Sequence, residues 1–475
     1  MEVYKRKKEK TLLLLLYYIL KKLSPEARLI IRHSYSTGVY CEIKNFKLKE
    51  DNFKKLCKKY EEILCQNKKI SSKILEKDKA IKFFENEGRN DVVKLLKYNQ
   101  REKIRIYGID DVYDYLFFPP FRDFSKIGFY RLKYYPPGFL LLFEEKFKEQ
   151  RKFFEAFEEA EHWAEILGIR NVGDLNEKIV EGEISDCIKI EEALHEKKIA
   201  NLADKIVETG KRVILVAGPS SSGKTTFSKR LRIQLMVNQR KVFIISMDDY
   251  FLPSEQCPRK PDGTLDTDAP EAIDIPLFKK QIKEILKGKE VILPKFNFTT
   301  RKREWRNKPF YLPKDGILII EGIHALNPIF CEELERCAFK IYVSALTPLN
   351  LDDHNRISTS HARLLRRIVR DYFYRGHRAG DTLRMWSTVR EAEEKYIFPH
   401  QENADEIFNS ALLYEIAVLK RFVIPLLDEI PEDMKEYEEA QLLKDFLSHF
   451  LPIETTDVPP TSILREFIGG SSFKY

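Results

Sequence analysis

Five short, nearly continuous apolar runs alternate with segments of helical spacing after about residue 199. The runs occupy 212–218, 242–246, 317–322, 339–345 and 404–410. Apolar runs of this kind are typical of strands that are buried on both faces. Their alternation with helices predicts a parallel sheet with crossover connections. The pattern therefore predicts one α/β domain over residues 199–475.

The chain before residue 199 follows a mixed pattern. An apolar first helix, a strand at 38–43 and amphipathic helices at 49–65 and 77–87 come in that order. An aromatic stretch with four prolines at 113–142 then predicts short strands and turns. A charged helix is expected to begin near Phe143. We expect an α+β domain over 1–145 and a helical connector over 146–198.

The apolar run from Leu12 to Leu20 follows a basic start, as in a signal peptide. The run is too short to span a bilayer, and no small-residue cleavage site follows it. We therefore expect a buried or half-buried helix in preference to a targeting or membrane segment.

Charge and cysteine content narrow the choice of ligand and compartment. The chain has 82 basic and 74 acidic residues, a net charge of +8. That balance fits a small anionic ligand and is too mild to require a nucleic-acid partner. Seven scattered cysteines, without a CxxC pair, indicate reduced thiols in a cytoplasmic protein.

The segment "GPSSSGKTT" at 218–226 follows the first apolar run of the α/β half and matches the P-loop pattern GxxxxGK[ST]. A buried strand before it and a helix after it are the context that this motif needs. Lys224 would reach the β- and γ-phosphates of a nucleoside triphosphate, and Thr225 would hold Mg²⁺. Phosphate contacts are expected from Gly218, Ser220, Ser221, Ser222, Gly223, Lys224, Thr225 and Thr226.

Acidic residues follow the next two strands of the expected sheet. Asp248 ends the second strand in "ISMDDYF" and is our candidate general base, because ligands bind at the carboxyl ends of parallel strands. Asp249 could take this role or cap the turn. Glu321, at the end of the third strand, would complete a Mg²⁺ shell or contact the acceptor. The absence of an NKxD motif after the loop argues against a GTPase.

These motifs and those that follow them resemble the uridine kinase/phosphoribulokinase family, most closely uridine kinase. The matching segments are the P-loop, "SMDDYF", "DAPEAIDI" at 268–275, "LPKFNFTTRKR" at 293–303, "IIEGIH" and "RRIVRDYFYRG" at 366–376. The resemblance implies transfer of the γ-phosphate of ATP or GTP to a nucleoside 5′-hydroxyl, with Mg²⁺. It places Asp248 as the base and Asp268 at the ribose hydroxyls. The acceptor residues that it implies are Asp248, Tyr250, Asp268, Phe296, Phe298, Arg301 and Arg370.

The arginine-rich segment 363–378 allows three interpretations, one of which is a patch that binds nucleic acid. At helical spacing Arg363, Arg367 and Arg370 share a face, which could be a solvated basic surface. It could instead be a lid that closes on the triphosphate and neutralises its charge. The family resemblance favours the lid, with Arg367 and Arg370 as catalytic residues and Arg375 at the nucleotide.

The segment that recognises the base departs from the uridine kinase pattern. Where the family carries a Tyr and a His, this chain has Phe296 and Arg301. Phe296 keeps a stacking face without a hydroxyl, and Arg301 is purely a donor. A pyrimidine nucleoside, a purine nucleoside, and a sugar or sugar phosphate all stay open as acceptors.

The first half resembles the appended domain of threonyl-tRNA synthetase through "HSYSTGVYCEI" and the segments that follow it. The editing ligands of that enzyme are not matched, because His33 and Cys41 stand without partners at the required spacing. We expect a non-catalytic domain that serves packing, regulation or RNA contact.

Three functions compete on this sequence. The first is a nucleoside kinase, the second a kinase of the same fold acting on a sugar, sugar phosphate or other small alcohol. The third is an NTP-dependent RNA-binding or regulatory protein that contacts tRNA through the first half. The choice between ATP and GTP, and homo-oligomerisation, stay open.

Overall fold

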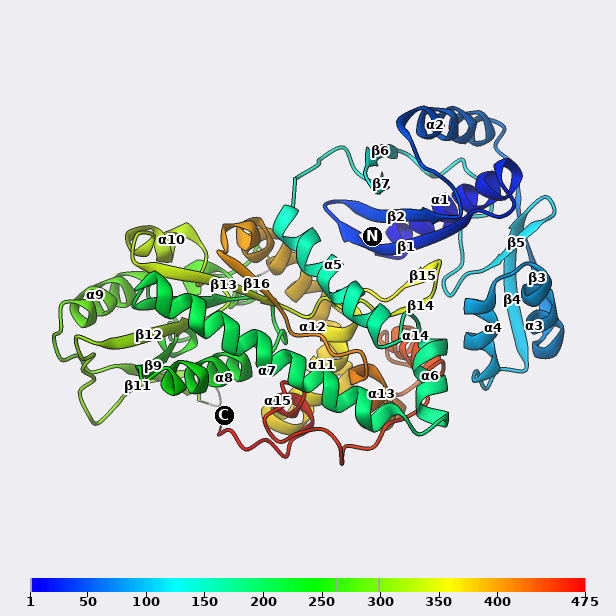
Figure 1. Ribbon diagram of the computed structural model, residues 1–475. Helices are drawn as coiled ribbons and strands as arrows, with labels where there is room; N and C mark the ends of the chain where they lie inside the picture. The colour runs from blue at the N-terminus through cyan, green and yellow to red at the C-terminus, as the bar shows by residue number, and fades with distance from the viewer. Residues whose placement is uncertain (1, 262, 298–299, 475) are drawn as a thin grey trace. The chain divides into compact units, whose positions relative to one another are not determined.

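The chain forms two compact units, each assembled from segments that are distant in the sequence. The computed structural model describes residues 2–261, 263–297 and 300–474 (Figure 1). The first unit comprises Met1–Ile184, Thr347–His361 and Gln441–Ile453. The second comprises Ser185–Leu346, Ala362–Ala440 and Glu454–Tyr475. The domain limits expected at residues 145 and 198 stay a prediction.

Antiparallel sheets and short helices make up the first unit. One sheet has the order β1-β2-β7-β6, and a second has the order β3-β4-β5. The elements of this unit are α1 Glu2–Leu23, β1 Arg28–Tyr35, β2 Gly38–Lys44, α2 Glu50–Cys65, β3 Ile70–Glu76, α3 Lys77–Asn86, α4 Asn90–Lys97, β4 Lys103–Ile109, β5 Val112–Tyr115, β6 Arg131–Tyr135, β7 Gly138–Leu142, α5 Arg151–Ile166, α6 Val172–Val180, β14 Asn350–Asp352 and β15 Asn355–Arg356.

Helix α1 supplies the centre of the first unit's core. Its apolar run from Leu12 to Leu20 is buried all round, as expected of a helix that is apolar on every face. The expectation of a buried helix there is confirmed. Within the described part of the chain, no helix has both the length and the apolar content to cross a bilayer.

A five-stranded parallel sheet organises the second unit (Figure 1). Its strand order is β16-β13-β8-β12-β9, and α8 packs on β8, β9 and β12. The elements are α7 Ile184–Thr209, β8 Val213–Ala217, α8 Lys224–Val237, β9 Lys241–Ser246, α9 Ile275–Leu286, β10 Pro294–Asn297, β11 Lys302–Trp305, β12 Gly316–Glu321, α10 Pro328–Cys331, β13 Ala338–Ser344, α11 Thr359–Arg375, α12 Ala379–Ala392, β16 Glu406–Asn409, α13 Glu415–Asp428 and α15 Arg465–Ile468. Helix α14 Tyr437–Leu447 begins in this unit, and its residues from Gln441 onward belong to the first.

The predicted α/β class is confirmed, and each of the five apolar runs is a strand of the parallel sheet. One expected boundary in the first half was wrong, and one strand was not predicted. The charged helix α5 begins at Arg151, eight residues after the expected start, because 143–150 is irregular. Strand β1 was not expected, although its burial alternates strictly along Arg28–Tyr35.

Buried ion pairs anchor helix α11 in the second unit. Arg366 is fully buried, and its Nε donates to Glu415 Oε2 at 2.9 Å. Its Nη2 donates to the Ser410 carbonyl at 2.7 Å, beyond the end of β16. Glu415 opens α13 and is also fully buried. A buried charge that loses its partner is strongly destabilising, so this pair must form for α11 to dock.

We predict that Glu415→Ala lowers the midpoint of thermal unfolding, because it leaves the Arg366 guanidinium buried and uncompensated. The expected cost is about 3–5 kcal/mol. Differential scanning fluorimetry measures it. The matched control is Glu436→Ala, which removes a half-buried acceptor of the exposed Arg384 at 3.0 Å and should lower the midpoint much less. Equal midpoints for the two variants would contradict the anchoring role.

Candidate active site

Backbone geometry shapes the P-loop between β8 and α8. Gly218 has no room for a side chain, since a Cβ there would lie 2.1 Å from the Val343 carbonyl oxygen. Gly223 has φ +84°, and a Cβ on it would lie 2.5 Å from Ile463 Cγ2. Both glycines are therefore required, and the loop enters α8 in the left-handed conformation that a phosphate cradle uses.

Two arginines of α11 bind the carbonyl side of this loop. Arg363 Nη1 donates to the Ser220 carbonyl at 3.0 Å, and Arg366 Nη1 donates to the Ser221 carbonyl at 3.4 Å. Arg363 also pairs with Glu393, whose Oε1 accepts the Ser220 N–H at 3.1 Å. Both guanidiniums are buried. They hold the loop through its carbonyl groups, and neither lies on a solvated face of the helix.

Lys224 is the first residue of α8 and is buried. Its Nζ donates to the Pro219 carbonyl at 3.1 Å. Burial lowers the pKa of Lys224, while the carboxylates of Glu321 and Asp248 oppose that shift. The Lys224 ammonium therefore lies near the carboxylates of Asp248 and Glu321, at the carboxyl ends of β9 and β12. From this position it can reach a phosphate in the loop.

Thr225 and Glu321 meet at the end of β12. Thr225 Oγ1 donates to Glu321 Oε2 at 3.1 Å. Burial raises the pKa of Glu321 to about 7, with Lys224 opposing the shift and Asp248 adding to it. A hydroxyl and a buried carboxylate are hard oxygen ligands, and the raised pKa reflects an acid that a cation would stabilise. These two residues fit Mg²⁺, which protein sites hold with one or two side chains plus phosphate oxygens.

The adjacent acids after β9 have different partners. Asp249 accepts from Arg306 Nη2 at 2.9 Å and from the Phe296 N–H at 3.4 Å. Asp248 is half-buried, and desolvation raises its pKa while Lys224 and Arg375 oppose the shift. The structure therefore ties Asp249 to the β10–β11 hairpin and leaves Asp248 beside the P-loop lysine.

Asp371, a fully buried residue of α11, organises the other arginines of that helix. It pairs with Arg370 at 2.8 Å, Arg367 at 3.0 Å and Arg375 at 3.7 Å. Burial would raise the pKa of Asp371, but these guanidiniums outweigh it and lower the pKa. Arg367 Nη1 also donates to Ser220 Oγ at 2.8 Å. Three cations thus gather beside the phosphate loop around one carboxylate.

Asp268 lies in the loop that precedes α9. Its backbone carbonyl accepts from His324 Nε2 at 2.9 Å, and His324 follows β12 in the "IIEGIH" segment. Burial lowers the pKa of His324 to about 4, so the ring is neutral near pH 7. Burial also raises the pKa of Asp268, and Arg367 opposes that shift. The histidine therefore fixes the backbone that carries Asp268.

The remaining acceptor candidates have different environments. Tyr250 is fully buried, and its hydroxyl donates to Gln281 Oε1 at 2.9 Å, so it builds the core beneath the loop. Phe296 is half-buried on β10 against Phe251, with the ring centroids 5.6 Å apart. Arg301 is exposed in the β10–β11 turn with φ +53°. Phe298 lies outside the described residues.

Four carboxylates of the site were missed by sequence reasoning. Glu393 and Asp371 hold arginines, and Glu415 holds Arg366. Glu466 accepts from Thr226 of the P-loop helix. Glu393, Glu415 and Glu466 lie outside the quoted motifs and carry no pattern that marks them, so only the three-dimensional structure reveals them. Asp371 lies within the arginine-rich motif, and its spacing from Arg367 and Arg375 was a signal that could have indicated the pairing.

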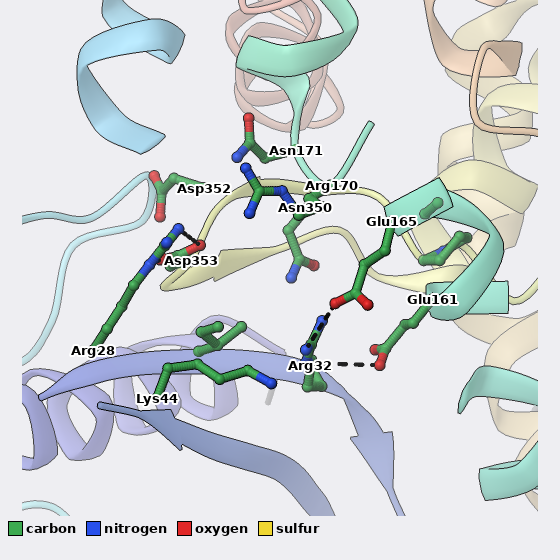
Figure 2. Close-up of a pocket in the computed structure, with 13 residues that line it drawn as sticks. Arg28, Arg32, Lys44, Glu161, Glu165, Arg170, Asn171, Asn350, Asp352 and Asp353 are labelled. Atoms are coloured by element: carbon green, nitrogen blue, oxygen red, sulfur yellow. Dashed lines mark hydrogen bonds and ion pairs between the residues drawn. The ribbon is translucent and has the colours of Figure 1, made fainter. Parts of the chain in front are cut away.

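A separate pocket of about 240 Å³ lies within the first unit (Figure 2). Its acids and bases pair with one another: Arg28 with Asp353, and Arg32 with Glu161 and Glu165. Asn350 donates to the Ile31 carbonyl at 2.8 Å. The pocket contains none of the P-loop residues, so it is not the phosphate site.

Comparisons with known proteins match the second unit. The model of the "Phosphoribulokinase / Uridine kinase family" matches residues 213–417. A uridine kinase of Mycoplasma pneumoniae is 30% identical over 213 residues, which cover 44% of this chain and 90% of that protein. A uridine kinase of Lactobacillus helveticus is 29% identical over 197 residues, 41% of this chain and 84% of that protein.

A solved structure described as a possible uridine kinase from Bacillus stearothermophilus is 19% identical and covers 45% of this chain and 98% of that one, with a TM-score of 0.32. The match of the family model begins at β8 and includes the P-loop, Asp248, Glu321 and α11. The chain belongs to the phosphoribulokinase/uridine kinase family and is an ATP-dependent kinase with an alcohol acceptor.

Proposed function

We propose that this kinase transfers the γ-phosphate of ATP or GTP to the 5′-hydroxyl of a nucleoside, with Asp248 as the general base. The observation that carries this proposal is that Asp248 and Asp249, the two acids after β9, have different partners. Asp249 is bound to Arg306, whereas Asp248 lies beside Lys224 and within the field of Arg370 and Arg375. The relatives named uridine kinase support a nucleoside as the acceptor.

The proposed mechanism combines positioning with charge neutralisation. Asp248 accepts the proton of the attacking hydroxyl, so the ionised form of Asp248 is the active one. Lys224 and the arginines gathered by Asp371 stabilise the negative charge on the phosphates during transfer. Arg370 lowers the pKa of Arg375 to about 10, together with burial, so Arg375 remains charged near pH 7. Asp268 would hold the ribose hydroxyls, since a carboxylate accepts two hydrogen bonds.

Thr225 and Glu321 are the residues that would hold Mg²⁺. Bound Mg²⁺ would neutralise phosphate charge at this point of the site. Among the described residues, no cluster of three or more His, Cys, Asp or Glu side chains is arranged to hold a metal ion. A site of one hydroxyl and one carboxylate therefore depends on phosphate oxygens for its remaining ligands.

We further propose that the first unit is a non-catalytic domain of the threonyl-tRNA synthetase-like kind. His33 is buried and stacked on Phe157 at 4.3 Å, and burial lowers its pKa to about 3. Cys41 is also fully buried within the core. Because the His33 imidazole is neutral and packed and the Cys41 thiol is inaccessible, these residues support a structural and not a catalytic role for this unit.

An acceptor screen tests the proposed function. Purified protein with Mg²⁺ and ATP, or GTP, is assayed for ADP or GDP release with the common nucleosides, ribulose 5-phosphate and several free sugars. The proposal predicts strong turnover with at least one nucleoside. Turnover confined to a sugar or sugar phosphate would contradict the nucleoside assignment and leave the kinase assignment intact.

We predict that Asp248→Asn lowers kcat by about 10²–10⁴-fold, because it removes the proton acceptor. Binding of ATP should persist, since the phosphate loop is unchanged. Steady-state kinetics and calorimetric titration with ATP measure the two quantities. Asp249→Asn is the matched control and should keep most of the turnover. Near-normal turnover of the Asp248 variant would show that this residue is not the base.

We also predict an acid limb in the pH profile of kcat that belongs to Asp248. Desolvation raises the pKa of Asp248 above its ordinary value of 3.8. Activity should therefore be present at higher pH and fall as pH drops through that raised pKa. The profile is measured at saturating Mg²⁺, with fluorescence at each pH as a control for folding. A limb at or below 3.8 would contradict the assignment.

A further inference from the structure

The C-terminal tail of the chain lies outside the family match and belongs to the second unit. The match ends at residue 417, whereas Glu454–Tyr475 is part of the kinase unit. Ile463, Leu464 and Phe467 are buried, and the Arg366 guanidinium lies 5.2 Å from the centre of the Phe467 ring. The tail is therefore anchored beside the P-loop that Arg366 supports.

Glu466, in the short helix α15, contacts the P-loop helix directly. Its Oε2 accepts hydrogen bonds from the Thr226 backbone N–H at 3.1 Å and from Thr226 Oγ1 at 2.7 Å. Its charge also acts on Lys224 and Glu321, which are the phosphate and metal candidates of the site. A carboxylate of the tail thus lies inside the electrostatic environment of the phosphate site.

Thr226 lies at the start of α8, the end of a P-loop helix that meets phosphate. Thr226 is the third residue of α8, and the first N–H groups of a helix have no partner within the helix. In a P-loop these groups cradle the α- and β-phosphates. The Glu466 carboxylate therefore accepts a hydrogen bond from the Thr226 N–H, which in a P-loop donates to a phosphate oxygen.

We propose that Glu466 is a built-in competitor for the triphosphate: its side chain occupies the Thr226 donors and must leave before phosphate binds there. Two negative groups cannot share these donors, since the second would be repelled and left without hydrogen bonds. This inference rests on the proposed binding of a nucleoside triphosphate to the P-loop. It makes the tail a regulator of nucleotide affinity.

The packing of the tail allows such an exchange without unfolding. Ile463 and Phe467, on either side of Glu466, are fully buried, whereas Glu466 itself is only half-buried. A rotation of the Glu466 side chain toward solvent would release the Thr226 N–H and hydroxyl while the tail backbone stays anchored. The Glu466 side chain alone would therefore compete with phosphate, while the rest of the tail holds it in place.

The test compares the affinity of wild-type protein, Glu466→Ala and Glu466→Gln for ATP, ADP and adenosine by calorimetric titration, with and without Mg²⁺. Glu466→Ala should lower the Kd for ATP and ADP about tenfold, because the cost of breaking two hydrogen bonds to a charged group disappears. Glu466→Gln should give a smaller gain, since the amide oxygen still accepts. Adenosine, which has no phosphate, should bind all three proteins equally.

Glu454→Ala is the matched control, because Glu454 lies in the same tail and pairs with Arg421 on the surface. It should leave the Kd for ATP unchanged. Weaker ATP binding by Glu466→Ala, with Mg²⁺ or without it, would overturn the proposal and make Glu466 a support of the loop or a metal ligand. Wild-type protein that binds no ATP would instead contradict the proposed function itself.

Discussion

The phosphate loop is a strained backbone turn whose carbonyl side must be held by buried positive charge. Arg363 and Arg366 supply that charge to the carbonyls of Ser220 and Ser221. Each guanidinium is buried, so each needs its own carboxylate, and these come from helices that follow α11 in the chain. The cradle therefore depends on α11 being docked, and Arg367 and Arg370 on the same helix are positioned by that docking.

The carboxylates of the site have separate tasks because their partners differ. An acid bound to a guanidinium, such as Asp371 or Asp249, orders the structure around it. An acid whose pKa burial raises, such as Asp248 or Glu321, remains ready for a proton or a cation. Glu466 belongs to neither group, because it accepts hydrogen bonds that a phosphate would otherwise receive. Binding of a nucleotide would therefore change the charge balance at the start of α8.

The sheet was predictable because its strands are buried on both faces and appear as continuous apolar runs. The P-loop was predictable from the spacing of its glycines, which the structure explains: Gly223 has a positive φ, and a side chain at Gly218 would meet the Val343 carbonyl. The strand order, and the return of Thr347–His361 to the first unit, were not predictable from local pattern. The same holds for Glu466, whose contact with Thr226 joins segments distant in the sequence. The partners of Asp371 lie on its own helix, so spacing alone could have indicated them. The spacing of the arginines on α11 predicted that they share a face, but it did not predict that Arg363 is buried.

The most direct test of the central claim is the position of the phosphoryl group in the product. A nucleoside that supports turnover is converted with ATP, and the product is analysed by phosphorus–proton correlation NMR. An acceptor held by Asp268 at its ribose diol, with Asp248 as base, predicts coupling of the new phosphorus to the C5′ protons. Coupling to the C2′ or C3′ proton, or phosphorylation of a non-nucleoside alone, would contradict the account.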